Sequence, residues 1–150
     1  MIDHISFLDR EHTELLEKLQ QYALNKGRLG TIFSQILAIF SYHLDREEET
    51  VIPLLAYLKE RMGRKKRPNL EYFRKISSEF DNEFENMIKE HLQIEDLCQD
   101  AITLAGTDCI EIHDLSGSLR RHMLLEEQLL YPAAQAATFL LEREVSGVIQ

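Results

Sequence analysis

Apolar residues recur every three or four positions along almost the whole chain, which is the spacing of one buried face of an α-helix. The pattern divides into four stretches, separated near Gly27, Gly63 and Gly106. Four amphipathic helices joined mostly by short connections predict an all-α fold, an antiparallel up-down-up-down four-helix bundle. A chain of 150 residues has the size of one ordinary domain, so we expect residues 1–150 to fold as a single domain. In chain order, the apolar positions of the four stretches are Ile5, Leu8, Leu15, Leu16, Leu19 and Tyr22; Phe33, Ile36, Phe40, Leu44, Val51 and Leu54; Phe80, Phe84, Ile88, Ile94, Cys98 and Ile102; and Ile112, Leu115, Leu119, Leu129, Ala133 and Leu140.

Several residues predict where these helices begin, bend or end. Asp108, followed three positions later by Glu111, has the pattern of a capping box and predicts the start of the fourth helix. Pro53 and Pro132 fall inside apolar stretches and should kink or end their helices, because proline has no backbone N–H to donate. The basic run GRKKRPN at 63–69 is expected to be a solvated loop whose positive charges favour the end of the preceding helix.

Polar residues interrupt each stripe at positions where the pattern requires a buried apolar side chain. One histidine interrupts the stripe of the first stretch, and a histidine and a glutamate four residues apart interrupt the stripe of each of the other three. Side chains at this spacing lie only about 40° apart around a helix, so both members of a pair should face the core. The interrupting residues are His12, His43 with Glu47, His91 with Glu95, and His122 with Glu126.

The sequence around these histidines is repeated. HLDREEETVIP begins at His43 and HMLLEEQLLYP begins at His122, which lies 79 positions later. Both strings place two adjacent glutamates four and five residues after the histidine, and a proline ten residues after it. His12 and His43 are 31 positions apart, as are His91 and His122. Equal spacing in two helix pairs indicates one duplicated arrangement with a shared role, rather than four unrelated core histidines.

A bound metal is the simplest reason to bury so many polar groups. A buried carboxylate without a partner costs several kcal/mol, which is large against a typical domain stability of about 5–15 kcal/mol. A cation reverses this penalty, because each buried lone pair becomes a ligand. Imidazole nitrogen together with carboxylate oxygen suits iron, manganese or zinc. Four histidines and two glutamates also exceed the needs of one tetrahedral zinc site.

This set of donors predicts two metal ions. If Glu47 and Glu126 both bridge, each metal receives two histidine nitrogens and two carboxylate oxygens. A bridging oxo or hydroxo group would make each metal five-coordinate and leave open positions for a small molecule. We therefore expect two Fe ions, ahead of Mn or Zn. The predicted metal ligands are His12, His43, Glu47, His91, His122 and Glu126, with Glu95 as an additional candidate.

Other histidines and acidic residues near these positions are interpreted differently. His113 should point about 180° away from His122 on an ideal helix, and His4 stands at the start of its stretch, so neither is expected to bind metal. Glu48 and Glu127 lie about 100° further round the helix than the proposed ligands. They are expected to be solvated, or to hydrogen-bond a metal ligand without binding the metal themselves.

Two tyrosines and one cysteine also lie close to the predicted ligands. Tyr42 and Tyr131 could hydrogen-bond a bound oxygen species, although packing between helices is the favoured interpretation. Cys98 is expected to serve as a small buried side chain. A ferritin-like di-iron fold would need Glu-x-x-His on two helices, and this motif does not occur in the sequence.

Composition and charge narrow the partners and the compartment. The formal net charge of −9 argues against nucleic acid or an anionic membrane surface as a partner. No stretch approaches the apolar length of a membrane span, and charged residues interrupt the N-terminal region where a signal peptide would lie. The two cysteines offer no disulfide framework, so a reducing, cytoplasmic location is expected.

From DREHTELL to HMLLEEQLLYP the sequence resembles the hemerythrin-like (HHE cation-binding) family. The resemblance implies an antiparallel four-helix bundle around a non-haem, oxo-bridged di-iron centre, with the six predicted ligands at the family's metal-binding positions. Oxygen-carrying hemerythrins have a second histidine four residues after the one on the third helix, where this chain has Glu95. In this respect the chain looks more like relatives that repair iron–sulfur centres or handle nitric oxide.

Three functions follow as hypotheses. A binding module would hold O2 or NO without turnover, for sensing or storage. An enzyme would consume peroxide or NO at the open iron positions. An iron donor would release metal to damaged iron–sulfur centres. In each case a signal or an electron would pass through a separate redox or signalling partner protein, or through assembly, and no catalytic side chain is assigned.

Overall fold

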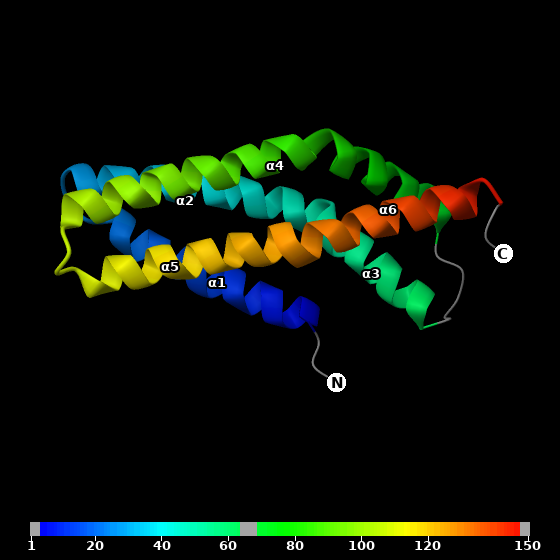
Figure 1. Ribbon diagram of the computed structural model, residues 1–150, viewed down its shortest axis with the longest axis horizontal. Coiled ribbons are helices and arrows are strands. Elements are labelled where there is room, and N and C mark those ends of the chain that lie inside the picture. Colours follow the sequence, from blue (N-terminus) through cyan, green and yellow to red (C-terminus); the bar gives the residue numbers. More distant parts are fainter. Residues whose placement is uncertain (1–3, 64–68, 148–150) are drawn as a thin grey trace. The chain divides into compact units, whose positions relative to one another are not determined.

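The computed structural model describes residues 4–63 and 69–147, and all regular elements in these ranges are helices (Figure 1). The predicted all-α class is therefore confirmed. The middle of the basic loop, residues 64–68, lies outside the described residues. No helix in the described ranges combines the length and the apolar character needed to cross a bilayer. The elements are α1 (His4–Ala23), α2 (Arg28–Glu49), α3 (Val51–Met62), α4 (Leu70–Ala105), α5 (Ile110–Leu125), the π-helical turn η1 (Glu126–Leu130) and α6 (Tyr131–Val145).

The chain packs as two compact units. Residues 1–44 and 87–124 form the first, and residues 45–86 and 125–150 form the second. Helices α2 and α4 are each divided between the units, with one segment of the helix in the first unit and the other segment in the second.

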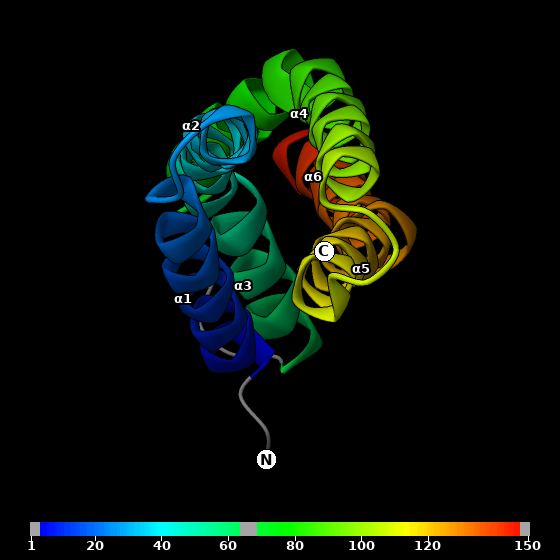
Figure 2. The same cartoon turned by 90° about the vertical axis from the view of Figure 1, so that its left-hand side faces the viewer.

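The first unit is an antiparallel four-helix bundle. Its helices are α1, residues 28–44 of α2, residues 87–105 of α4, and α5. Figures 1 and 2 show these segments side by side, with the direction of the chain reversing from each to the next. Apolar side chains from all four segments fill the core, so the predicted up-down-up-down bundle is confirmed. The core includes Leu15, Leu19, Phe33, Ile36, Phe40, Leu44, Ile94, Cys98, Ala101, Ile112, Leu115, Leu119 and Met123.

The second unit is held by packing of α3 against α6. An ion pair between Arg61 and Glu144 joins these two helices. Aromatic contacts extend the core, with the rings of Tyr57 and Phe73 at a centroid distance of 5.2 Å.

Pro53 interrupts the second predicted helix, as expected. Helix α2 ends at Glu49 and α3 begins at Val51, with Thr50 between them at φ −124° and ψ −60°. Because Pro53 has no N–H, it cannot bond the carbonyl of Glu49 four residues earlier. The hydroxyl of Thr50 donates instead to the carbonyl of Arg46 at 2.7 Å.

Near Pro132 the interruption takes a different form. The backbone N–H of Tyr131 bonds the carbonyl of Glu126, five residues earlier, so this turn contains one extra residue. One extra residue rotates the following side chains by about 100° around the axis. Leu129, predicted to be buried, is 58% exposed. The face buried after this turn instead consists of Tyr131, Ala134, Ala137, Thr138 and Leu141.

The capping box predicted at Asp108 is not the observed start of the last bundle helix. Helix α5 begins at Ile110, so Cys109 precedes its first turn. The carboxylate of Glu111, which a capping box would direct toward the helix start, accepts a hydrogen bond from Tyr22 at 3.2 Å. The predicted end of α4 is confirmed, because the helix stops at Ala105 and Gly106 has the positive φ of 81° that glycine tolerates.

Candidate metal centre

Four histidines lie in the core of the first unit, one on each helix of the bundle. His12 is on α1, His43 on α2, His91 on α4 and His122 on α5, and none is more than 4% exposed. One turn earlier in its helix, each is preceded by a buried apolar side chain, namely Leu8, Phe40, Met87 and Leu119. The predicted burial of the four histidines is therefore confirmed.

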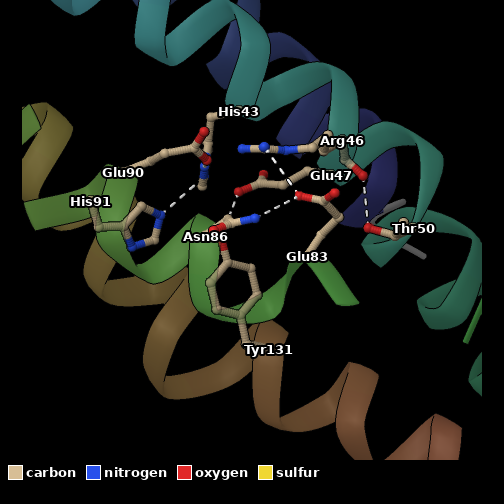
Figure 3. Close-up of polar contacts among 9 residues, drawn as sticks. All are labelled: His43, Arg46, Glu47, Thr50, Glu83, Asn86, Glu90, His91 and Tyr131. Carbon is tan, nitrogen blue, oxygen red and sulfur yellow. Dashed lines mark hydrogen bonds and ion pairs between the residues drawn. The ribbon is translucent and has the colours of Figure 1, made fainter. Parts of the chain in front are cut away.

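The four histidines form two pairs. The Nε2 atoms of His43 and His91 lie 3.0 Å apart (Figure 3). The rings of His12 and His122 meet edge to face, with centroids 4.8 Å apart and planes 77° apart. In each pair, ring nitrogens lie within 4.8 Å of one another. Two ring nitrogens at this separation can bind one cation placed between them.

Two carboxylates hold the outer nitrogens of these pairs. Nδ1 of His43 lies 3.0 Å from Oε1 of Glu90, and Nδ1 of His122 lies 2.8 Å from Oε1 of Glu11. A carboxylate is an acceptor, so it favours the tautomer that carries the proton on Nδ1. The lone pair then resides on Nε2. This is how a metal-binding histidine is usually oriented.

Glu11 and Glu90 were missed by the sequence reading, although the signal is present. They are 79 positions apart, which is the offset of the repeat, and each directly precedes a predicted ligand in a Glu-His dipeptide. Their partial exposure, 26% and 13% of the side chain, places them at the edge of the apolar stripe. The periodicity of the apolar stripe therefore does not indicate these two glutamates.

Two buried carboxylates lie in the second unit. Glu47 is 2% exposed and Glu126 is 1% exposed. Their carboxylate oxygens lie within 4.8 Å of each other. The hydroxyl of Tyr131 donates to Oε1 of Glu47 at 2.8 Å (Figure 3). Two carboxylates this close and this dry repel each other unless a cation or a proton compensates them.

Tyr131 retains its proton in this environment. Burial is the main cause that raises the pKa of Tyr131 above its ordinary value, and the negative charges of Glu47 and Glu126 raise it further. The hydroxyl therefore acts as a donor, and the ring packs edge to face on Phe84 at a centroid distance of 5.8 Å. Packing, the favoured interpretation of Tyr131, thus describes the ring, whereas the hydroxyl has a carboxylate partner that the sequence did not reveal.

Helix geometry connects the histidines to the carboxylates. His43 and Glu47 are one turn apart in α2, and His122 and Glu126 are separated by the same four residues where α5 passes into η1. Side chains four apart on a helix lie on one face, with Cβ atoms about 5–6 Å apart. Each of the two helices therefore presents a nitrogen and an oxygen on the same side.

A buried cation adjacent to this face also went unnoticed in the sequence. Arg46 is 8% exposed, and its guanidinium donates to Oε2 of Glu83 at 3.2 Å (Figure 3). The amide of Asn86 donates to the same oxygen at 3.4 Å. Pairing with Glu83 compensates the positive charge of Arg46, which burial would otherwise destabilise.

Glu95, the additional ligand candidate, does not join the buried groups. Its side chain is on the exposed side of α4, and Ile94 takes the buried position next to it. From His91, the buried face continues through Ile94 and Cys98, at steps of three and four residues. A four-residue step to Glu95 is equally consistent with the sequence pattern, but it leads about 40° off this face.

The remaining neighbours are mostly outside the core. Glu48 and Glu127 are exposed, and Tyr42 is 59% exposed. His113 lies on α5, is partly buried, and does not join the His/Glu clusters found among the described residues. His4 begins α1, and its side chain lies outside the described part of the structure.

The chemistry of the buried groups fits a metal ion. Imidazole nitrogens and carboxylate oxygens, without a thiolate set, are ligands of iron, manganese and zinc. The His/Glu clusters are dry, converging and oriented from outside by carboxylates, so they could hold a cation.

Comparisons with known proteins agree with this chemistry. The family model described as Hemerythrin HHE cation binding domain matches residues 3–134, which include all six predicted ligands. Searches of curated proteins and of solved structures returned no match. The match covers most of the chain and runs through both units, and the observed bundle has the fold that the sequence resemblance implied. The chain therefore belongs to the hemerythrin HHE cation-binding domain family.

Proposed function

We propose that this chain is a non-haem di-iron protein whose iron pair binds a small diatomic ligand, O2 or NO, or peroxide, for sensing, storage or detoxification. Two observations carry the proposal: four buried histidines form two pairs, with two of the histidines held by outer carboxylates, and two buried glutamates lie close together. The proposed iron ligands are His12, His43, Glu47, His91, His122 and Glu126.

The pairing of the histidines suggests how the ligands divide between the two irons. His43 and His91 would bind one iron, and His12 and His122 the other, because the ring nitrogens of each pair converge. Glu47 and Glu126 would bridge the two. An oxo or hydroxo group would complete the cofactor as a third bridge. When bound, the iron pair supplies redox equivalents and Lewis acidity.

The chain's own residues prepare this centre. Glu11 and Glu90 favour the tautomers of His122 and His43 that carry the proton on Nδ1, which leaves the Nε2 lone pair for a metal. Glu47 and Glu126 are almost fully buried, and the low dielectric of a buried site strengthens the attraction between a carboxylate and a cation. Glu47 and Glu126 are unfavourable when the centre is empty and favourable when it is filled, so metal binding should stabilise the fold.

The departure at Glu95 favours reactivity over reversible oxygen transport. Oxygen-carrying relatives place a fifth histidine at this position, and here the side chain is exposed. Fewer protein ligands leave more coordination positions open. Two further candidates are therefore a peroxide- or NO-consuming enzyme and an iron donor to iron–sulfur centres.

Anaerobic reconstitution with Fe(II), followed by metal analysis and a visible spectrum, tests the metal centre. We expect two irons per chain in the wild type, fewer in Glu47→Ala and in His122→Ala, and two in the control His113→Ala, whose histidine is on the same helix as His122. Equal loss of metal in all three variants would contradict the ligand assignment. A wild-type protein that retains no transition metal would refute the proposal.

Stopped-flow mixing of the reduced protein with O2 separates the functional candidates. A stable charge-transfer band would support an oxygen-binding module, whereas rapid autoxidation would support the enzyme or the iron donor. Catalytic loss of peroxide would then favour the enzyme, and transfer of iron to an apo iron–sulfur protein would favour the donor.

A further inference from the structure

We propose that Tyr131 is a positioning residue that fixes one oxygen of Glu47 and thereby makes the two bridging carboxylates chemically different. The inference rests on the proposed di-iron function and deepens it. It concerns only groups within the second unit, which contains Glu47, Glu126 and Tyr131.

The contact has the features of a fixed hydrogen bond. The Tyr131 hydroxyl lies 2.8 Å from Oε1 of Glu47, Tyr131 is 1% exposed and Glu47 is 2% exposed (Figure 3). The ring is held against Phe84, so the hydroxyl has little freedom to turn away. A hydrogen bond between a neutral donor and a buried carboxylate is stronger than one between neutral groups.

The π-helical turn brings Tyr131 to this position. In a regular α-helix, the positions one turn after Glu126 would be Leu129 and Leu130, and Tyr131 would lie further round the axis. Because η1 contains one extra residue, Tyr131 follows Glu126 on the buried side instead, and its N–H bonds the Glu126 carbonyl. Such turns are often found at functional sites, and this one delivers a hydroxyl to the carboxylate pair.

The repeat does not provide a second hydroxyl of this kind. The residue 79 positions before Tyr131 is Ile52, whose side chain has no polar atom. The first half of the repeat also has a break at Thr50 where the second half has the π-helical turn. The duplication therefore supplies matching metal ligands but a tyrosine in only one half.

A difference between Glu47 and Glu126 follows from this asymmetry. The hydroxyl draws electron density from Oε1 of Glu47 and keeps that oxygen in one orientation. Glu47 should then bind metal more strongly through its other oxygen than through Oε1. The two irons would consequently have different surroundings, although their side-chain ligands match in number and type.

Tyr131→Phe tests this role, with Tyr57→Phe as the matched control. Both substitutions remove one hydroxyl from a fully buried ring of the second unit. Besides burial, the charge of nearby Glu144 raises the pKa of Tyr57, and no hydrogen bond joins the Tyr57 hydroxyl to Glu47 in the described structure. Each protein is loaded anaerobically with Co(II), and metal stoichiometry, dissociation constants and the visible d–d spectrum are measured.

We expect Tyr131→Phe to bind two Co(II) ions, with the weaker site losing about tenfold in affinity and the d–d bands shifting. Tyr57→Phe should retain both the affinities and the spectrum of the wild type. An unchanged spectrum and affinity in Tyr131→Phe would overturn the inference, as would equal changes in both variants. If the wild type itself fails to bind two metals, the di-iron proposal fails instead, so the two failures are distinguishable.

A measurement on the wild type keeps the inference testable if Tyr131→Phe does not fold. The infrared C–O stretch of ring-labelled tyrosine is compared before and after Co(II) loading, with Tyr57→Phe as a reference. Metal binding weakens Glu47 as an acceptor, so one tyrosine band should shift on loading in both proteins. The absence of any shift would contradict a hydrogen bond that acts on the metal ligand.

Discussion

Replacement of Glu126 by methionine should make the metal-free protein more stable while weakening metal binding. Glu126 is 1% exposed, and its carboxylate lies within 4.8 Å of the Glu47 carboxylate. Methionine has a similar length, removes the buried charge and relieves the repulsion at Glu47. Substituting buried charged groups by apolar side chains of similar volume is typically neutral or stabilising by about 1–4 kcal/mol. A gain of about 2 kcal/mol in the free energy of unfolding is therefore expected for the metal-free form. For a chain of this size, that gain corresponds to an increase in Tm of roughly 4–8 °C.

The assay is urea unfolding of each protein after chelation and again with excess Fe(II) under anaerobic conditions. Metal present at 100 times its Kd stabilises the native state by about 2.7 kcal/mol, and Glu126→Met should lose most of this increment. Glu142→Met is the control, because Glu142 is an exposed glutamate of the same unit. It should change neither form by more than about 0.5 kcal/mol.

Two outcomes would refute the reasoning. Lower stability of metal-free Glu126→Met than of the metal-free wild type would mean that the carboxylate stabilises the empty fold. An undiminished stabilisation of Glu126→Met by iron would mean that Glu126 is not part of the metal centre.

Three further predictions use other features of the structure. Glu11→Gln and Glu90→Gln should each weaken metal binding by about 10–100-fold in equilibrium titrations, because an amide orients the Nδ1–H of histidine less strongly than a carboxylate does. Equal metal affinity in the wild type and the variants would mean that these carboxylates do not assist the histidines. Cys98 is 0% exposed, and burial raises the pKa of its thiol, so alkylation of Cys98 should require opening of the first unit and should slow when metal is bound. The partly exposed Cys109 should react faster, and peptide mapping of the alkylated cysteines tests this order. Because the pKa of Tyr131 is raised in the folded state, the folded protein binds more protons than the unfolded chain above pH 10, and the free energy of unfolding should fall as pH rises further. The slope from this residue should reach about 1.4 kcal/mol per pH unit, and Tyr131→Phe should reduce it in urea unfolding between pH 9 and 11.

The fold and the histidines could be predicted because they leave a clear periodic signal. Each buried histidine replaces an apolar residue in a stripe of regular spacing, and the duplication repeats that replacement. Glu47 and Glu126 follow from the same logic, since a four-residue step keeps them beside His43 and His122. In physical terms, the pattern specifies which face of a helix is buried, and the predicted ligands lie on that face.

Other features were not predictable, because the periodic pattern does not contain them. From His91, a step of three residues to Ile94 and a step of four to Glu95 are both consistent with the stripe, and in the structure Ile94 is the buried residue. The π-helical turn adds one residue to a regular repeat, so the predicted face of Leu129, Ala133 and Leu140 is not the buried face of this segment. The link from Tyr131 to Glu47 joins residues 84 positions apart, and the sequence alone gives no indication of it.

The duplicated halves of the chain depend on each other for both histidine pairs. His43 meets His91, and His12 meets His122, so both pairs join the first repeat to the second. The supporting carboxylates also join the two halves. Glu11 of the first half pairs with His122 of the second, and Glu90 of the second half pairs with His43 of the first. A helical hairpin made of one half alone contains only one histidine of each pair and therefore forms neither pair. Separately produced fragments should therefore remain without the histidine pairs until they associate.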